Sequence, residues 1–247
     1  MKHFASWFSV CLLACLIACF APRPLAAQGQ SAAPKPAAHS AADPGLLHPA
    51  TLNAKAPDVY EATFTTTKGD FVVQVTRSWA PNEADRFYNL VKHGYFSGVE
   101  FFRVVPGFVV QFGLTGSPAV NKAWESANIK DDPNTQTNAE GTITFAQTGS
   151  PNSRSTQVFI NLGNNAGLDH SGQGFAPFGQ ITSGMDVVKN LYGGYADAPT
   201  GHQDEITNRG NAYLEKNFPK LDSIKSAKIT SPVPAPSATH KAAPPAQ

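Results

Sequence analysis

An arginine and a glutamine stand in a stretch that otherwise has the composition of a hydrophobic β-hairpin. In FFRVVPGFVVQFG, residues 101–113, two apolar runs meet at Pro106-Gly107, a dipeptide typical of turns. The β-branched and aromatic residues favour strands, but Arg103 interrupts the first run and Gln111 the second. A buried guanidinium is costly unless it is paired or faces a wet cavity. Arg103 therefore either forms a structural ion pair or is a charged donor in a binding groove.

Few other residues are spaced for catalysis or metal binding. Asp169-His170-Ser171 contains the residue types of a hydrolase triad, but triads are assembled from distant segments, and neighbours on one loop point in different directions. No two histidines within residues 59–229 have the spacing of a metal site. The 3 cysteines all lie before residue 20, so the rest of the chain has no disulfide framework and no thiol nucleophile. We therefore expect neither a metal nor a cofactor.

The elements that would position Arg103 and Gln111 are mostly strands. Besides the hairpin, runs with strand-like alternation or β-branched content lie within residues 60–75, 141–147, 156–163, 174–181 and 221–230. Helices are indicated over 81–94 and 183–194, and more weakly over 205–218, where Gly210 interrupts the pattern. Residues 114–140 form a long polar connection. The sequence thus predicts a mainly β domain over residues 59–229, a closed barrel capped by helices.

Four segments of this domain resemble one family. FFRVVPGFVVQFG resembles the signature of the cyclophilin-type peptidyl-prolyl cis-trans isomerases. GTITFAQTGSPNSRSTQVFIN (141–161), LDHSGQGFAPFGQITSGMDVV (168–188) and YFSGVEFFRV (95–104) resemble further segments of that family, in the family's order. The resemblance implies an eight-stranded antiparallel barrel with an α-helix over each end and a substrate groove on one outer face.

The resemblance also implies a role for each matching residue. Arg103 falls on the catalytic arginine. The proline pocket would be formed by Phe108, Val109, Phe159 and Leu168, and the substrate backbone would be held by Gln111, Ala146, Gln147 and Gln157. The expected partners are proline-containing segments of folding proteins.

The chemistry of X-Pro isomerisation explains these residue types. Rotation about the bond has a barrier of about 18–20 kcal/mol because amide resonance is lost. No bond is made or broken, so no nucleophile, general base or metal is required. The prolyl nitrogen gains a lone pair in the twisted transition state, and a donor aimed at it binds that state more tightly than the planar one. Arginine suits this task because it is always charged and presents several donors in a rigid fork.

Several positions depart from the family's pattern. Phe102 replaces a histidine beside the arginine, Val109 a methionine of the proline pocket, and Val158 a second phenylalanine of that pocket. Gln147 replaces an asparagine, and Gly167 stands where a tryptophan occurs in some members. The changes at 109 and 158 leave a second reading open, in which the groove binds proline peptides without catalysis.

The two ends of the chain differ in composition from the domain. Lys2 and His3 precede an apolar run without acidic residues, which predicts a secretory signal over 1–27 and hence export to the periplasm. Leu16–Cys19 resembles a lipobox, so a lipoprotein tethered to the membrane through Cys19 is the alternative. Residues 28–58 and 230–247 are rich in alanine and proline and are predicted to be disordered. Without residues 1–27 the chain has 17 basic and 18 acidic residues, a balance that does not indicate nucleic acid as a partner.

Overall fold

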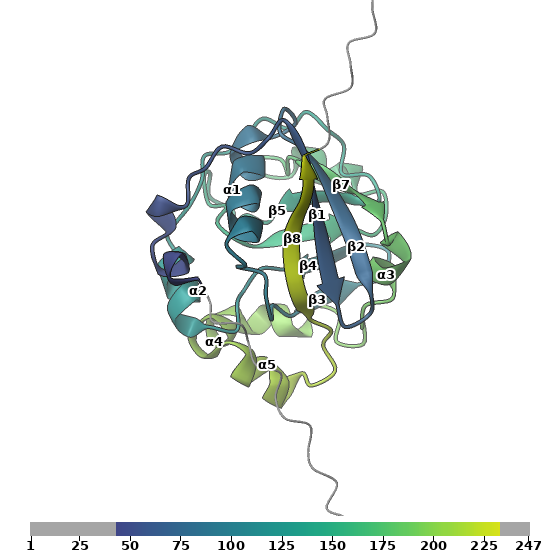
Figure 1. Ribbon diagram of the computed structural model, residues 1–247. Coiled ribbons are helices and arrows are strands. Elements are labelled where there is room, and N and C mark those ends of the chain that lie inside the picture. The colour runs from purple at the N-terminus through teal and green to yellow at the C-terminus, as the bar shows by residue number, and fades with distance from the viewer. Residues whose placement is uncertain (1–42, 233–247) are drawn as a thin grey trace, which may run out of the picture. The chain divides into compact units, whose positions relative to one another are not determined.

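Eight antiparallel strands form one curled sheet in the computed structural model, which describes residues 43–232 (Figure 1). The strands are β1 Val59–Thr66, β2 Asp70–Thr76, β3 Arg103–Val105, β4 Val109–Phe112, β5 Thr142–Phe145, β6 Val158–Asn161, β7 Gly179–Ser183 and β8 Ile224–Pro232. Their order in the sheet is β3-β4-β6-β5-β7-β2-β1-β8. The prediction of a mainly β fold with eight antiparallel strands is confirmed.

The two edge strands, β3 and β8, do not pair with each other through a regular ladder. The segments just before them are joined by backbone hydrogen bonds instead. Gly98 N donates to Ile224 O at 2.7 Å, and Phe101 N donates to Asp222 O at 3.0 Å. The barrel predicted as closed is therefore a curled sheet whose ends meet only through this short seam.

Glu100 lies within the seam and makes the stability of the fold depend on pH. Its side chain is buried, and burial, with repulsion from Glu215 as a smaller cause, raises the pKa of Glu100 to about 8. The folded state therefore holds a proton that the unfolded state releases near pH 4.5. Because the folded state binds more protons between these values, stability falls as pH rises through that window.

We expect the free energy of unfolding to decrease between about pH 5 and pH 8, with Glu100 contributing a slope of up to about 1.4 kcal/mol per pH unit. Urea unfolding across this range measures it. Glu100→Gln should reduce the slope by the share that Glu100 contributes and be more stable than the wild type above pH 8. Glu215→Gln should remove only part of that share. The remaining slope includes the share of Glu83, whose pKa burial also raises to about 8. An unchanged slope in Glu100→Gln would show that this carboxyl titrates normally.

The helices cover the sheet and its open ends. They are α1 Pro81–Lys92, α2 Pro118–Trp124, α3 Met185–Lys189, α4 Gln203–Arg209 and α5 Asn211–Asn217, with 3-10 turns η1 Pro44–Leu47, η2 Pro49–Thr51, η3 Ala166–His170 and η4 Ala198–His202. α1 begins at Pro81 as predicted, and its stripe of Ala84, Phe87, Leu90 and Val91 is buried. Phe87 packs against Phe64 and Phe178, with ring centroids 5.9 and 4.9 Å apart, so the helix contributes to the core inside the curl.

Three helical features differ from the sequence prediction. The helix expected over 183–194 is shorter, since α3 spans only Met185–Lys189. α2 lies inside the segment 114–140 that was predicted to be a polar connection, and Trp124 at its end is fully buried. The helix expected over 205–218 is divided at Gly210, whose φ of 60° and close approach to Gly116 O, 2.1 Å from an ideal Cβ position, exclude any other residue. α4 and α5 are the result.

The prediction that residues 28–58 are disordered is wrong for residues 43–58. This segment, drawn in purple in Figure 1, runs beside α2 and is held by specific contacts. Trp124 Nε1 donates to Leu46 O at 2.8 Å, Asn89 Nδ2 donates to Ala54 O at 2.7 Å, and the side chain of Leu46 is buried. One large apolar side chain and matching polar groups on the domain are sufficient to fix an Ala/Pro-rich segment.

Leu46→Ala should therefore lower the free energy of unfolding by about 2–4 kcal/mol, because it leaves a cavity under the segment. The adjacent Leu47 is a matched control: it is 48% exposed, and Leu47→Ala should change stability by less than about 0.5 kcal/mol. Urea unfolding of both variants measures the difference. Equal effects would mean that the segment does not stabilise the domain.

The other predictions for the chain ends are only partly covered. β8 extends through residue 232, so the predicted disordered tail does not begin at 230. The predicted signal at 1–27 and Cys19, and residues 28–42 and 233–247, lie outside the described residues. From 43 to 232, no helix has the length and apolar character needed to cross a membrane.

Candidate active site

Arg103, Gln111 and Phe159 form a row across three neighbouring strands. Arg103 on β3 pairs with Gln111 on β4, and Gln111 pairs with Phe159 on β6. Directly paired residues of antiparallel strands project from the same face of the sheet. Val110 and Phe112, which alternate with Gln111, belong to the core inside the curl, so the row lies on the outer face.

Hydrogen bonds link this row of side chains. Arg103 Nη1 donates to Gln111 Oε1 at 3.2 Å, and Gln111 Nε2 donates to Gln157 Oε1 at 2.9 Å. At one end, Arg103 Nε donates to Asp197 Oδ1 at 2.5 Å; at the other, Gln157 Nε2 donates to Gln203 Oε1 at 2.9 Å. Arg103 therefore forms an ion pair and also belongs to the row of groove side chains. The two alternatives for this arginine, a structural ion pair or a donor in a groove, both apply.

An apolar wall stands beside the guanidinium. Arg103 Cζ lies 5.4 Å from the ring centroid of Phe108, which is half-buried. The carbonyl of Phe108 accepts from Leu162 N and from Asn165 Nδ2, both at 2.8 Å, which fixes the turn between β3 and β4. Val109 beneath it is almost fully buried.

The second wall comes from the loop after β6. Leu168 on η3 and Phe175 are half-buried, and Phe175 packs edge-on against Phe159 with ring centroids 5.4 Å apart. Asn138 donates to Asp169 Oδ1 from its backbone N at 2.8 Å and from Nδ2 at 2.7 Å, which holds η3 in place. Asp169 is thus occupied by structural hydrogen bonds rather than by a triad partner.

A cavity of about 290 Å³ adjoins the row at Gln111 and Gln157. Gln111, Ala146, Gln147, Gln157 and Gln203 line it, with Trp124. Gln147 Nε2 donates to Gly174 O at 3.1 Å, and within residues 43–232 its buried Oε1 has no hydrogen-bond partner. The groove therefore offers hydrogen-bonding groups next to an apolar pocket, as binding of an extended peptide requires.

Comparison with known proteins identifies the family. The family model described as cyclophilin type peptidyl-prolyl cis-trans isomerase matches residues 62–211. Peptidyl-prolyl cis-trans isomerase B of Escherichia coli is 32% identical over 147 residues, which cover 58% of this chain and 90% of that protein. An Acinetobacter baylyi peptidyl-prolyl cis-trans isomerase is 33% identical over 165 residues, covering 66% of this chain and 86% of that one.

The chain belongs to the cyclophilin-type peptidyl-prolyl cis-trans isomerases. A crystal structure of a cyclophilin from Cryptosporidium parvum has the same fold, with a TM-score of 0.52, 19% identity, and coverage of 70% of this chain and 98% of that chain.

All nine site residues predicted for the cyclophilin groove lie on the outer face of β3, β4 and β6 or on the adjoining loops. The row of hydrogen bonds joins Arg103, Gln111 and Gln157. Ala146 is joined to the end of this row, since its N–H donates to Gln157 O at 2.9 Å. The individual roles of these residues in the reaction remain predictions.

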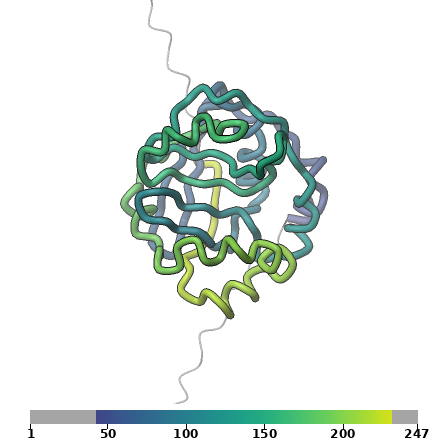
Figure 2. The backbone as a smooth tube through the Cα atoms, turned by 180° about the vertical axis from the view of Figure 1, so that it is seen from behind, coloured from purple at the N-terminus to yellow at the C-terminus, as the bar shows by residue number. Residues whose placement is uncertain are grey.

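The sequence prediction missed two groove residues, Asp197 and Gln203. Both belong to a segment of the cyclophilin domain, residues 193–220, that carried no recognised motif. The pale green part of this segment runs along the β3–β4 hairpin in Figure 2, and Ala196 forms a bridge with Val104. Phe102, which replaces the family's histidine, is buried against Ile206 and Leu214 of the same segment. The apolar residue at position 102 is thus explained by packing against this segment, but it gives no signal for Asp197 or Gln203.

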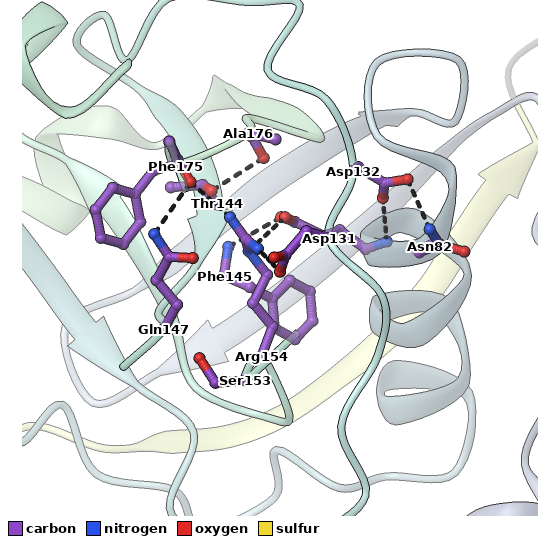
Figure 3. A network of polar contacts seen from close by, with 12 residues as sticks. Asn82, Asp131, Asp132, Thr144, Phe145, Gln147, Ser153, Arg154, Phe175 and Ala176 are labelled. Carbon is purple, nitrogen blue, oxygen red and sulfur yellow. Dashed lines mark hydrogen bonds and ion pairs between the residues drawn. The ribbon is translucent and has the colours of Figure 1, made fainter. Parts of the chain in front are cut away.

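A buried ion cluster of Arg154, Glu83 and Asp131 lies next to the groove of the isomerase (Figure 3). The side chain of Arg154 is completely buried, with Nε 3.0 Å from Glu83 Oε1 and Nη1 paired with Asp131. Burial raises the pKa of Glu83 to about 8, opposed by the charge of Arg154. Arg154 Nη2 donates to Gly174 O at 2.6 Å, the same carbonyl that accepts from Gln147, so the cluster holds a groove residue in place.

Within the described part of the chain, no group of three or more histidine, cysteine, aspartate or glutamate side chains is arranged to hold a metal ion.

Proposed function

We propose that this isomerase catalyses X-Pro rotation with Arg103 as the donor to the prolyl nitrogen. Phe108, Val109, Phe159 and Leu168 hold the proline ring. Gln111, Ala146, Gln147 and Gln157 hold the peptide backbone on the polar side of the groove. The preceding carbonyl is then free to swing while the ring stays fixed.

One observation carries this proposal: a guanidinium held at Nη1 by Gln111 lies beside the ring of Phe108. The apolar ring beside the guanidinium leaves little room for water when a substrate is bound. The hydrogen bond from the charged donor to the prolyl lone pair, which forms only in the twisted state, is therefore stronger than it would be in water. Binding that is stronger in the transition state than in the ground state accelerates the reaction.

The test is the cis-to-trans rate of a short X-Pro peptide with the purified protein, with a chelator present and absent. We expect catalysis that the chelator does not change. A folded protein that binds the peptide saturably without accelerating rotation would instead support the non-catalytic binding module.

We further propose that the clients are proteins that fold after export. Uncatalysed X-Pro isomerisation takes tens of seconds or longer and limits folding. The basis is the signal predicted over residues 1–27, which would direct the enzyme to the periplasm. Mass spectrometry of the protein isolated from cells distinguishes a free N-terminus near Gln28 from a lipidated Cys19, and an intact residue 1 would contradict both forms of export.

A further inference from the structure

The hydrogen-bonded row of the groove begins and ends on one short segment. Asp197 holds Arg103 at one end and Gln203 holds Gln157 at the other. These two residues flank η4, the turn Ala198–His202. A single turn therefore contacts both ends of the row that crosses the groove.

The segment is fixed firmly against the hairpin. Ala196 has a φ of 46°, a conformation that residues other than glycine rarely adopt, and it is held there by its bridge to Val104. Gly193 lies so close to Pro106 that an added Cβ would be 3.2 Å from Pro106 Cγ. These contacts bring the carboxylate of Asp197 to the guanidinium of Arg103.

The pair itself adds little to folding, because the side chains of Arg103 and Asp197 are 25% and 57% exposed. The ion pair instead fixes the orientation of the Arg103 guanidinium. With Nε bound to Asp197 and Nη1 bound to Gln111, the plane of the guanidinium is fixed on two edges. Within residues 43–232 neither contact uses Nη2, so both N–H groups of Nη2 and the second N–H of Nη1 are left to donate to a substrate.

We propose that Asp197 and Gln203 are positioning residues of the isomerase, which hold Arg103 and Gln157 from opposite ends of η4. This inference rests on the proposed role of Arg103. Misplacing a catalytic group by about 1 Å can lower a rate by about a hundredfold, and a guanidinium still held by Gln111 should lose less.

The experiment compares Asp197→Ala, Asp197→Asn, Gln203→Ala and Asp204→Asn in the full chain. We expect Asp197→Ala to lower kcat about tenfold with KM changed less than twofold. Asp197→Asn keeps an acceptor oxygen and should retain at least half of the activity. Gln203→Ala acts through two further amides and should lower kcat about threefold. Asp204→Asn removes the same charge from an exposed position of the segment and should behave as wild type.

A second readout follows the guanidinium directly. The Nε–H signal of Arg103 in NMR spectra should exchange slowly with water in the wild type and in Asp197→Asn, and rapidly in Asp197→Ala. This readout needs no catalysis, so it separates failure of the positioning role from failure of the proposed function, which would appear as an inactive wild type with a protected Nε–H.

Three results would overturn the proposal. Wild-type kcat in Asp197→Ala would show that the contact does not position the donor. Increased activity in both Asp197→Ala and Asp197→Asn would show that the carboxylate suppresses Arg103. Equal losses in Asp197→Ala and Asp204→Asn would assign the effect to the charge of the segment.

Discussion

Arg103→Ala is expected to lower kcat/KM for isomerisation of an X-Pro peptide by between about tenfold and a hundredfold. A hydrogen bond from a charged donor contributes about 1.5–3 kcal/mol, and each 1.36 kcal/mol is about a factor of ten in rate. The loss should fall on kcat more than on KM, because the pocket of Phe108, Phe159 and Leu168 remains to bind the ground state. A protease-coupled or NMR exchange assay measures it.

Arg103→Lys separates charge from geometry. Lysine keeps the charge but cannot contact Gln111 and Asp197 through a planar fork, so we expect only partial recovery of the rate. Arg209→Ala is the matched control, because Arg209 pairs with Glu205 on the surface of α4. Unchanged catalysis by a folded Arg103→Ala would mean that the groove accelerates rotation through pocket shape alone.

The largest effect on stability is expected for Arg154→Ala, a loss of about 3–5 kcal/mol in the free energy of unfolding. The variant leaves the fully buried carboxyl group of Glu83 and the carboxyl group of Asp131 without the guanidinium that pairs with them, and it leaves Gly174 O without one of its two donors. Urea unfolding measures the loss. Gly174 O also accepts from Gln147, so Arg154→Ala should bind substrate peptide more weakly than the wild type, even at temperatures where the variant is folded.

Two further variants test whether the loss arises from the unpaired charge. Arg154→Met combined with Glu83→Gln and Asp131→Asn removes the ionisable groups of the cluster while filling most of the volume, and it should recover part of the stability. Arg209→Ala breaks an exposed pair, with side chains 52% and 50% exposed, and should cost less than about 1 kcal/mol. Similar losses in Arg154→Ala and Arg209→Ala would show that the buried cluster adds nothing beyond a surface pair.

Features with a local signature could be predicted from the sequence. Alternation in β4 places Val109 and Gln111 on one face and Val110 and Phe112 on the other, and the turn at Pro106-Gly107 sets the register with β3. The row of Arg103, Gln111 and Phe159 follows from that register once β6 is added. The family and the number of strands, eight, were predicted from the resemblance of four segments, and α1 from its own apolar stripe and from Pro81.

Only the tertiary structure showed the partners of these residues. Arg103 and Asp197 are 94 positions apart, and Trp124 and Leu46 are 78 apart, so no local pattern connects them. Arg154 stands in a polar run, TGSPNSRS, that has the composition of an exposed loop, yet the fold buries it completely. The sequence by itself indicated that Arg103 and Gln111 share a face of the hairpin, because strand periodicity is local, and the resemblance to the family supplied the other groove residues. The fold decided what holds them there, because burial and ion pairing depend on segments that meet only when the chain closes.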